Sequence, residues 1–212
     1  MMRLNSKSQA LLFGIIGSNV LVTVSWQSSF SDRKLNLFMR KNFTVSNYAV
    51  FKRKQYHTIV TSIFSHQDIG HLLTNMVSLY FVGSTLLCYM SPARFLGLYM
   101  ASGVASSYCQ IMLPKWVPRQ WPAARHQSIY DTSLGASGSL NGIVSYYILN
   151  FPRQVIYLYF VIPIPAAILG AGFIMKDAYG LYYGNNGIGN GGHLTGAVTG
   201  LAYFLLRRRL PI

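Results

Sequence analysis

Four polar residues of this chain that could do chemistry lie within long apolar stretches. His71 and Asn75 stand in one stretch, Ser137 in a second and His193 in a third. Polar side chains are costly to bury in a hydrocarbon layer and usually serve a function there. A serine hydroxyl beside a histidine imidazole is the minimum arrangement for nucleophilic acyl transfer. The first question is therefore whether the chain can bring the serine and the histidine together.

Two glycine pairs offer a way to make that contact. Gly138 and Gly142 follow the serine, and Gly196 and Gly200 follow the histidine, both with the small-xxx-small spacing. His193, Gly196 and Gly200 follow the i, i+3, i+7 spacing, so they share one face of a helix. Glycine faces of this kind let two helix backbones approach closely. If the two helices pack through them, the nucleophile and the base come within contact.

The depth of each polar residue can be estimated from the charges that flank its stretch. Asn75 and Ser137 lie seven and six residues past the aspartates that precede them, which is about 10 Å below one face at ~1.5 Å per residue. His193 lies fourteen residues before Arg207, about 20 Å from the opposite face, which leaves about 10 Å in a ~30 Å core. Three stretches thus place their polar residues at one level.

The charge pattern also predicts the fold class. Of the 212 residues, 51% are hydrophobic and 10% are charged, whereas a soluble domain carries about 25% charged residues. The uncharged stretches are each close to the ~20 residues that cross a hydrocarbon core. We therefore predict an all-α, polytopic membrane protein, a six-helix bundle in a single domain over residues 1–212. The predicted spans are 10–26, 69–91, 95–113, 133–151, 155–175 and 189–206.

The net charge of +14 is compatible with two anionic partners, nucleic acid and lipid. The cations lie between the apolar runs and not along one helical face, which favours anionic lipid headgroups and argues against nucleic acid. Cys88 and Cys109 both sit in apolar runs, as small core residues do, so we expect neither a disulfide framework nor a metal site. We expect no cofactor.

The four acidic residues, all aspartates, restrict the catalytic mechanism. Each is placed at an end of a predicted span, Asp177 among them, so none lies mid-membrane. A Ser-His-Asp triad is therefore not expected, and packing or a hydroxyl would orient His193. The same absence argues against an aspartyl protease, which needs two carboxylates. The chain also lacks the His-Glu-x-x-His motif of zinc proteases.

Water must reach a site about 10 Å deep. The long basic loop 27–67 and the glycine-rich stretch 184–192 are the candidates for the rim of a wet cavity. The second stretch includes Asn185, Asn186 and Asn190.

Three short motifs surround the polar residues: Phe64-x-His66 with His71-Leu72-x-x-Asn75, Gly135-Ala136-Ser137-Gly138, and His193-x-x-Gly196-x-x-x-Gly200. In their order and in their spans they resemble the second-helix, nucleophile and sixth-helix motifs of the rhomboid family. The resemblance covers the six-helix core, which is nearly the whole chain. Segments 99–104 and 133–138 are most similar to the mitochondrial, presenilin-associated branch of that family.

The resemblance implies a role for each residue. Ser137 would be the nucleophile and His193 the general base. The oxyanion would be held by the backbone N–H of the serine together with His71 and Asn75, and His66 would be a structural residue near the first loop. Four glycines would support this arrangement: Gly135, Gly138, Gly196 and Gly200.

The chain departs from the family pattern at three places. His57 and Thr58 replace a Trp-Arg pair ahead of the second helix, and Asn141 stands four residues after the serine, where an aromatic residue is frequent. The residue before the sixth-helix histidine is Gly192 and not alanine. None of these changes removes a catalytic group.

The resemblance implies an intramembrane serine endopeptidase that cleaves the transmembrane segments of membrane proteins through a Ser-His dyad. It also implies a multi-pass integral membrane protein, and the narrower similarity implies the mitochondrial inner membrane. One alternative is a non-proteolytic binder of membrane-protein clients with the same fold, against which the intact Ser137 and His193 speak. Another is a small transporter, which would show paired ionisable groups near the midplane and inverted repeats, and neither is found.

Overall fold

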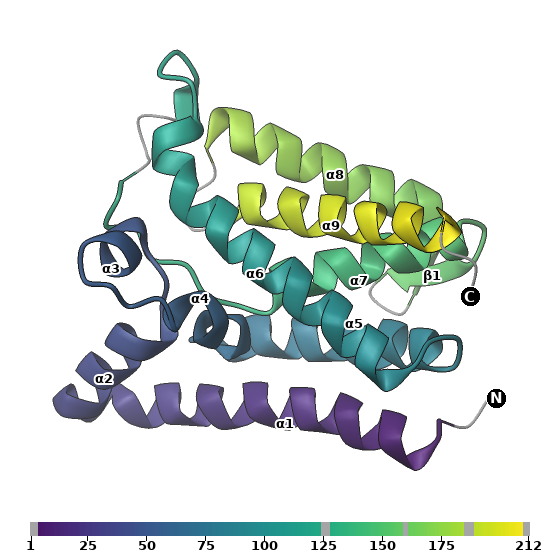
Figure 1. Ribbon diagram of the computed structural model, residues 1–212, viewed down its shortest axis with the longest axis horizontal. Coiled ribbons are helices and arrows are strands. Elements are labelled where there is room, and N and C mark those ends of the chain that lie inside the picture. The colour runs from purple at the N-terminus through teal and green to yellow at the C-terminus, as the bar shows by residue number, and fades with distance from the viewer. Residues whose placement is uncertain (1–3, 124–127, 159–160, 185–188, 210–212) are drawn as a thin grey trace.

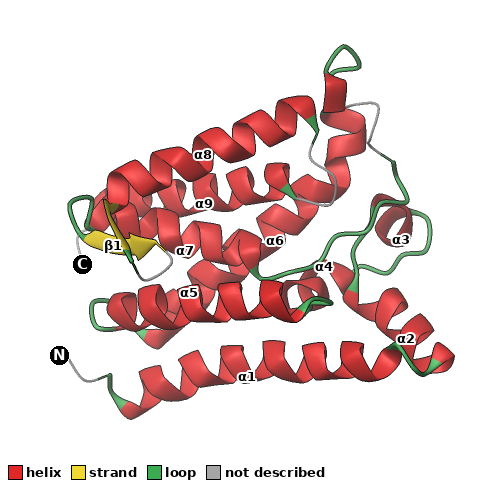
Figure 2. Cartoon of the chain, turned by 180° about the vertical axis from the view of Figure 1, so that it is seen from behind, coloured by secondary structure: helices red, strands yellow, loops and turns green. Residues whose placement is uncertain are grey.

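The computed structural model describes residues 4–123, 128–158, 161–184 and 189–209, and these residues are mostly helical, as predicted. Six helices form a bundle (Figure 1): α1 (Ser6–Ser29), α5 (Ile69–Leu87), α6 (Pro92–Trp116), α7 (Ser137–Asn150), α8 (Ala166–Tyr183) and α9 (Asn190–Arg209). Short helices gather at one end of this bundle: α2 (Arg33–Phe43), α3 (Asn47–Phe51), α4 (Thr58–Thr61) and η1 (Ser62–Phe64). The chain ends lie at the other end (Figure 2).

Side-chain caps fix where several helices begin. Asn5, Asp32, Asp68 and Ser91 each accept a backbone N–H from the first turn of the helix that follows. Such caps satisfy donors that the helix itself leaves unused. Helix α7 differs, because its N-cap residue Ala136 makes no side-chain cap bond. The first N–H groups of α7 are therefore left for another acceptor.

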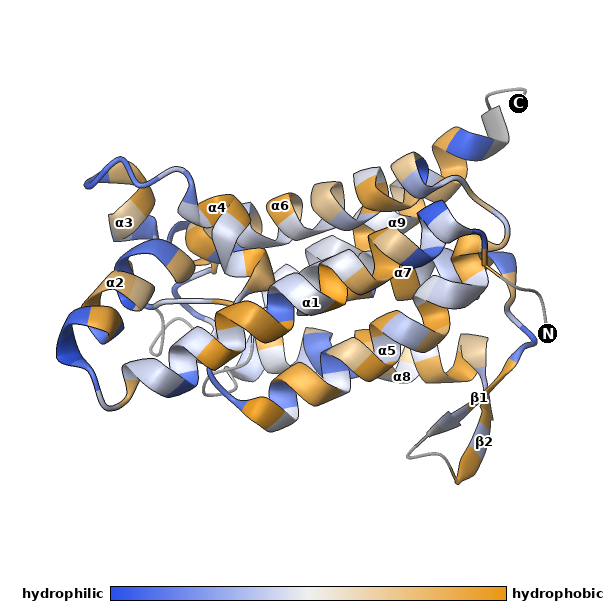
Figure 3. Ribbon diagram, turned by 90° about the horizontal axis from the view of Figure 1, so that it is seen from below, coloured by the Kyte–Doolittle hydropathy of each residue, from blue (hydrophilic) through white to orange (hydrophobic). Residues whose placement is uncertain are grey.

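The helices differ in how well they fit a hydrocarbon layer. By length and composition, α1 is the one helix within the described segments that is apolar enough to cross a membrane. Helix α7 has 14 residues, about 21 Å of helix against a core of ~30 Å. Hydrophilic residues colour both ends of the bundle in Figure 3. The structure shows a helical bundle, and the count of six spans stays a prediction.

The structure differs from the predicted fifth span, 155–175. That stretch opens with an antiparallel hairpin, β1 (Val155–Leu158) and β2 (Ile162–Pro165). β-branched residues favour a strand, and Pro163 and Pro165 lack the N–H that a helix interior needs.

The two prolines also define the outer edge of this hairpin. Pro163 pairs with Tyr157, and Pro165 pairs with Val155. The Ala166 N–H donates to the Gln154 carbonyl at 2.8 Å. Because antiparallel pairs alternate, the prolines occupy positions whose N–H groups would point away from β1. The outer edge of β2 therefore offers no proline N–H to a further strand.

Helices α7 and α9 pack through their glycine pairs. A Cβ atom added to Gly196 would overlap the carbonyl oxygen of Gly138, and one added to Gly200 would overlap that of Gly142. Backbone atoms cannot swing aside as a flexible side chain can. Glycine at these positions is therefore what allows the two helices to lie this close.

We expect Gly196→Ala to destabilise the bundle, because the new methyl group must push α9 away from α7. Overpacking of this kind costs typically 1–3 kcal/mol, or roughly 5 °C in Tm for a chain of this size. Gly97→Ala in α6 is the matched control, since nothing lies within 4 Å of a Cβ added there. Equal thermal unfolding temperatures for the two variants in detergent would contradict this reading of the α7–α9 contact.

Candidate active site

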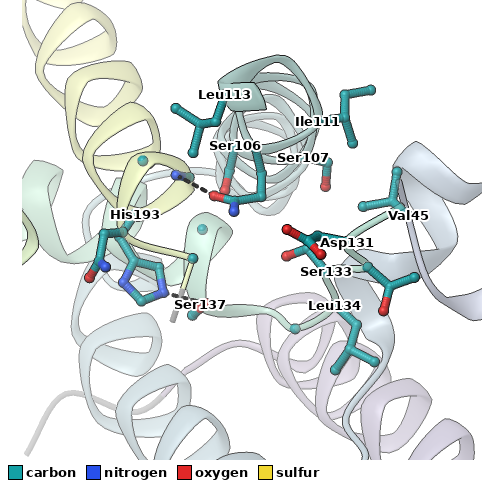
Figure 4. A pocket seen from close by; sticks show the side chains of 18 of the residues that line it. Val45, Ser106, Ser107, Ile111, Leu113, Asp131, Ser133, Leu134, Ser137 and His193 are labelled. Carbon is teal, nitrogen blue, oxygen red and sulfur yellow. Dashed lines mark hydrogen bonds between the residues drawn. The ribbon is translucent and has the colours of Figure 1, made fainter. Parts of the chain in front are cut away.

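The serine and the histidine meet at the starts of two adjacent helices. Ser137 is the first residue of α7, and His193 lies in the first turn of α9. The Ser137 Oγ and the His193 Nε2 are 2.9 Å apart, although 56 residues separate them in the sequence (Figure 4). The glycine contacts deeper in the same two helices hold them at this distance. This is the geometry that a nucleophile–base pair requires.

A carboxylate lies on the other side of the imidazole. The His193 Nδ1 is 3.2 Å from the Asp177 Oδ1, and the aspartate is 6% exposed. A carboxylate can only accept a hydrogen bond, so Nδ1 carries the ring hydrogen and donates a hydrogen bond to Asp177. Nε2 is then free to accept the hydroxyl proton of Ser137. This is the tautomer in which an imidazole can act as a general base toward serine.

The prediction that packing or a hydroxyl, and not an aspartate, orients His193 is wrong. A charge usually marks the end of a span, and by that rule Asp177 would lie at a boundary. In the structure α8 begins at Ala166 and continues to Tyr183, so the aspartate lies inside the helix. The signal was present in the sequence, since Asp177 is the single acidic residue after Arg153.

Lys176 also lies near the Asp177 carboxylate. Its Nζ lies 3.7 Å from the Asp177 Oδ1, and its side chain is 57% exposed, against 8% for the aspartate. An exposed ion pair contributes little, because water screens it. The buried contact with His193 is therefore the one that fixes the carboxylate.

The segment ahead of Ser137 is extended, which is why α7 starts later than the predicted 133. Ser133 and Val45 form an isolated bridge, with N–H to carbonyl distances of 2.8 and 2.9 Å. The Gly135 N–H donates to the Ser62 carbonyl at 2.9 Å. Gly135 has a φ of +127°, which favours glycine. The first loop thus holds the backbone that presents the serine.

His71 stands beside the same glycine. A Cβ added to Gly135 would lie 3.1 Å from the His71 Cε1 and 3.8 Å from the Ser137 Oγ. The imidazole and the hydroxyl therefore flank one point of the backbone. The structure brings His71 to the serine, as the sequence motif implies.

Asn75 is placed differently. It is 7% exposed, and its Nδ2 lies 2.8 Å from the His66 Nε2. The same Nε2 accepts the Ala136 N–H at 3.3 Å. Because a backbone N–H can only donate, Nε2 is an acceptor and the His66 proton sits on Nδ1. Asn75 thus contacts the residue that holds the backbone next to Ser137.

Burial makes His66 sensitive to acid. Burial, followed by the charge of His71, lowers the pKa of His66 from 6.5 to about 4. Between these values the unfolded chain binds a proton that the folded chain does not. Stability should therefore fall as the pH drops from 6.5 toward 4, by up to about 1.4 kcal/mol per pH unit.

The test compares thermal unfolding at pH 7 and pH 5 for the native chain and for His66→Gln. The glutamine oxygen can accept the Ala136 N–H, but it does not titrate in this range. We expect a smaller pH effect in the variant. An unchanged difference between the two pH values would show that His66 is not the group responsible.

A cavity of about 860 Å³ opens onto the serine and the histidine. Side chains of α6 and of the loop before α7 face it, including Ser106, Asp131 and Ser133 (Figure 4). The lining is polar enough to hold water next to Ser137. Of the predicted rim residues, Asn185 and Asn186 lie outside the described residues.

The structure explains one departure from the family pattern. The Gly192 N–H donates to the Gln110 Oε1 at 3.2 Å, and a Cβ at position 192 would lie 2.7 Å from the Ser106 Oγ. An alanine methyl group would require the Ser106 hydroxyl to turn away, whereas glycine leaves it in place. At another departure, His57 Nε2 lies 3.1 Å from the Asn42 Oδ1, and the Thr58 hydroxyl donates to the Gln55 carbonyl. These bonds link parts of the first loop to one another.

Comparison with known proteins agrees with the motifs. Residues 53–210 match the family model described as Rhomboid domain. The chain is 35% identical over 203 residues to RHOMBOID-like protein 12, mitochondrial, of Arabidopsis thaliana, covering 93% of this chain and 59% of the relative. It is 30% identical over 197 residues to Rhomboid protein 1, mitochondrial, of Saccharomyces cerevisiae, covering 91% and 52%.

A vertebrate relative matches over a similar region. Presenilin-associated rhomboid-like protein A, mitochondrial, of Danio rerio is 28% identical over 218 residues, covering 98% of this chain and 52% of the relative. The chain therefore spans between half and three-fifths of the length of these three relatives.

Proposed function

This chain belongs to the rhomboid family of integral membrane proteins, and from that premise we propose that it is an intramembrane serine endopeptidase. The observation that carries the proposal is the hydrogen-bonded series Ser137, His193 and Asp177, whose first two members line a polar cavity. The order of donors and acceptors in that series is the one a serine hydrolase needs.

In the proposed reaction the Ser137 Oγ attacks the carbonyl carbon of a peptide bond while its proton passes to the His193 Nε2. The tetrahedral intermediate collapses, the C–N bond breaks, and the same proton goes to the leaving amine. Water then attacks the acyl-enzyme, with the imidazole again taking the proton, and Ser137 is restored. Asp177 accepts the hydrogen bond from the His193 Nδ1 and stabilises the imidazolium in both steps.

The start of α7 supports the negative charge that develops on the carbonyl oxygen. Ser137 is the first residue of this helix, so the helix itself does not use its N–H. The absence of a side-chain cap at Ala136 keeps that donor free, and the helix dipole favours an anion there. His71 lies beside Gly135, two residues before Ser137, and its ring can donate a hydrogen bond. These are the proposed oxyanion donors.

Asn75 has two roles in the proposed reaction. One of its amide hydrogens is directed to His66, which positions Ala136 and the nucleophile. Its amide carries a second hydrogen, which can contribute to the oxyanion site once a substrate is bound. We therefore expect Asn75 to support the reaction less directly than Ser137 or His193.

The proposed substrates are membrane proteins with a transmembrane helix that unwinds near small or helix-breaking residues. Unwinding frees a carbonyl that the helix would otherwise hydrogen-bond. The relatives that the chain matches are named as mitochondrial proteins, so we propose the mitochondrial inner membrane as the location.

A serine-directed probe distinguishes the protease from the alternative function, a non-proteolytic binder of membrane-protein clients. For a protease, we expect a fluorophosphonate to label the purified chain in liposomes, and peptide mapping to place the label on Ser137. A chain that binds a helical client but resists labelling at all concentrations would favour the binder.

A further inference from the structure

A second cavity lies at the end of the bundle opposite the serine. It measures about 270 Å³ and is formed by the ends of α5, α7 and α9. Tyr146 lines it and stands nine residues after Ser137 on α7, about 13 Å along the helix. This cavity is therefore separate from the one that holds Ser137 and His193. Its lining is Leu86, Tyr89, Met90, Tyr146, Asn150, Phe151 and Arg207.

Arg207 gives this cavity its charge. Its Nη1 donates to the Tyr146 hydroxyl, and its guanidinium carbon lies 6.0 Å from the centre of the Tyr146 ring. Tyr146 is 1% exposed, so this contact anchors the arginine at the cavity wall. A guanidinium has five N–H donors, and the bond to tyrosine occupies one. The others are available to a ligand.

A second arginine lies at the same end of the bundle. Arg94 is in the first turn of α6, four residues after Met90 of the cavity lining. Two guanidinium groups therefore contribute positive charge to this end of the bundle. Positive charge concentrated at one place favours an anionic ligand there.

No acidic residue neutralises this end of the bundle, within the residues that the structure describes. The chain has four acids. Asp32 follows α1, Asp68 precedes α5 and Asp131 precedes α7, all at the serine end, while Asp177 contacts His193. The arginines therefore give this end of the bundle a positive potential at the membrane surface.

We propose that this cavity binds the phosphodiester group of an anionic phospholipid. Arg207 would contact the phosphate oxygens, which the planar guanidinium fork matches well, and Arg94 would add positive charge beside the headgroup. Leu86, Met90 and Phe151 would contact the glycerol and the first carbons of one acyl chain. A volume of about 270 Å³ fits the headgroup and not a whole lipid, so the chains extend into the bilayer. Basic pockets between helices at a membrane face bind lipid headgroups in this way.

The test measures thermal unfolding of the purified chain in neutral detergent micelles. Dioleoylphosphatidylglycerol should raise the Tm by roughly 5 °C at saturating amounts, whereas dioleoylphosphatidylcholine should not. Arg207→Gln should abolish the increase. Arg153→Gln is the matched control, because it removes one positive charge from the same end of the bundle without changing a residue of the cavity lining, and it should keep the full increase.

Two further measurements make the outcome decisive. If Arg207→Gln does not fold, Arg94→Gln takes its place, since that residue makes no bond to Tyr146, and it should reduce the increase in Tm. Inorganic phosphate is added alone to distinguish a lipid from a free anion. An equal increase with phosphate, or an undiminished lipid effect in both variants, would overturn the proposal. Fluorophosphonate labelling of Ser137 should be unchanged in both variants, so this proposal can fail while the proposed protease function stands.

Discussion

Ser137→Ala is expected to abolish cleavage of a reporter protein with a cleavable transmembrane helix, with a loss of at least ~10⁴-fold in kcat. The variant keeps the cavity and the His193–Asp177 contact, but it has no oxygen to form the acyl-enzyme. His193→Ala should have a comparable effect, because the hydroxyl then has no base within reach. Cleavage would be measured in liposomes that contain the reporter.

The control for this prediction is another serine of the same helix. Ser145 lies about two turns after Ser137 on α7 and is not part of the cavity lining. Ser145→Ala should cleave at the native rate. Full activity of Ser137→Ala would rule out the nucleophile assignment, whereas equal losses in both serine variants would point to misfolding.

Asp177→Asn should lower kcat by roughly 10²–10⁴-fold while leaving the KM for the reporter nearly unchanged. An asparagine amide can donate to the His193 Nδ1, and that bond would favour the tautomer whose Nε2 carries the proton. Such an imidazole cannot accept the proton of Ser137. A merely structural role for Asp177 would instead lower the Tm and raise the KM.

Asp131→Asn is the matched control for the aspartate. Asp131 also lines the large cavity, but its carboxylate accepts the Ser128 N–H at 2.7 Å and does not reach His193. Removing that charge should change kcat by less than tenfold. Native-like turnover by Asp177→Asn would show that packing or a hydroxyl orients the histidine, as the sequence analysis predicts.

Much of the site could be predicted because its signals are local. The spacing of His71 from Asn75, and of each glycine pair from its serine or histidine, is set by the helical repeat. Helical spacing therefore shows which side chains share a face before any packing is known. The same patterns carried the family resemblance, which the match over residues 53–210 confirms.

Other features do not follow from span length or helical spacing alone. The apolar run 155–175 satisfies the length of a span, yet two prolines and several β-branched residues make its first part a hairpin. Asn75 has the spacing of an oxyanion donor, but the loop residue His66 lies against it and accepts one of its two amide hydrogens. The periodicity of α5 alone cannot show which loop folds back onto it.

Sequence patterns alone are enough to predict the helical class, the family, and the pairing of Ser137 with His193 through glycine faces. The orientation of the histidine depends on the fold. A buried carboxylate is stable when a partner satisfies it, and the partner of Asp177 lies sixteen residues away on another helix. The partner can be identified only from the packing of α8 against α9. In the structure α8 continues past Asp177, so this aspartate lies beside His193 and not at the end of a helix.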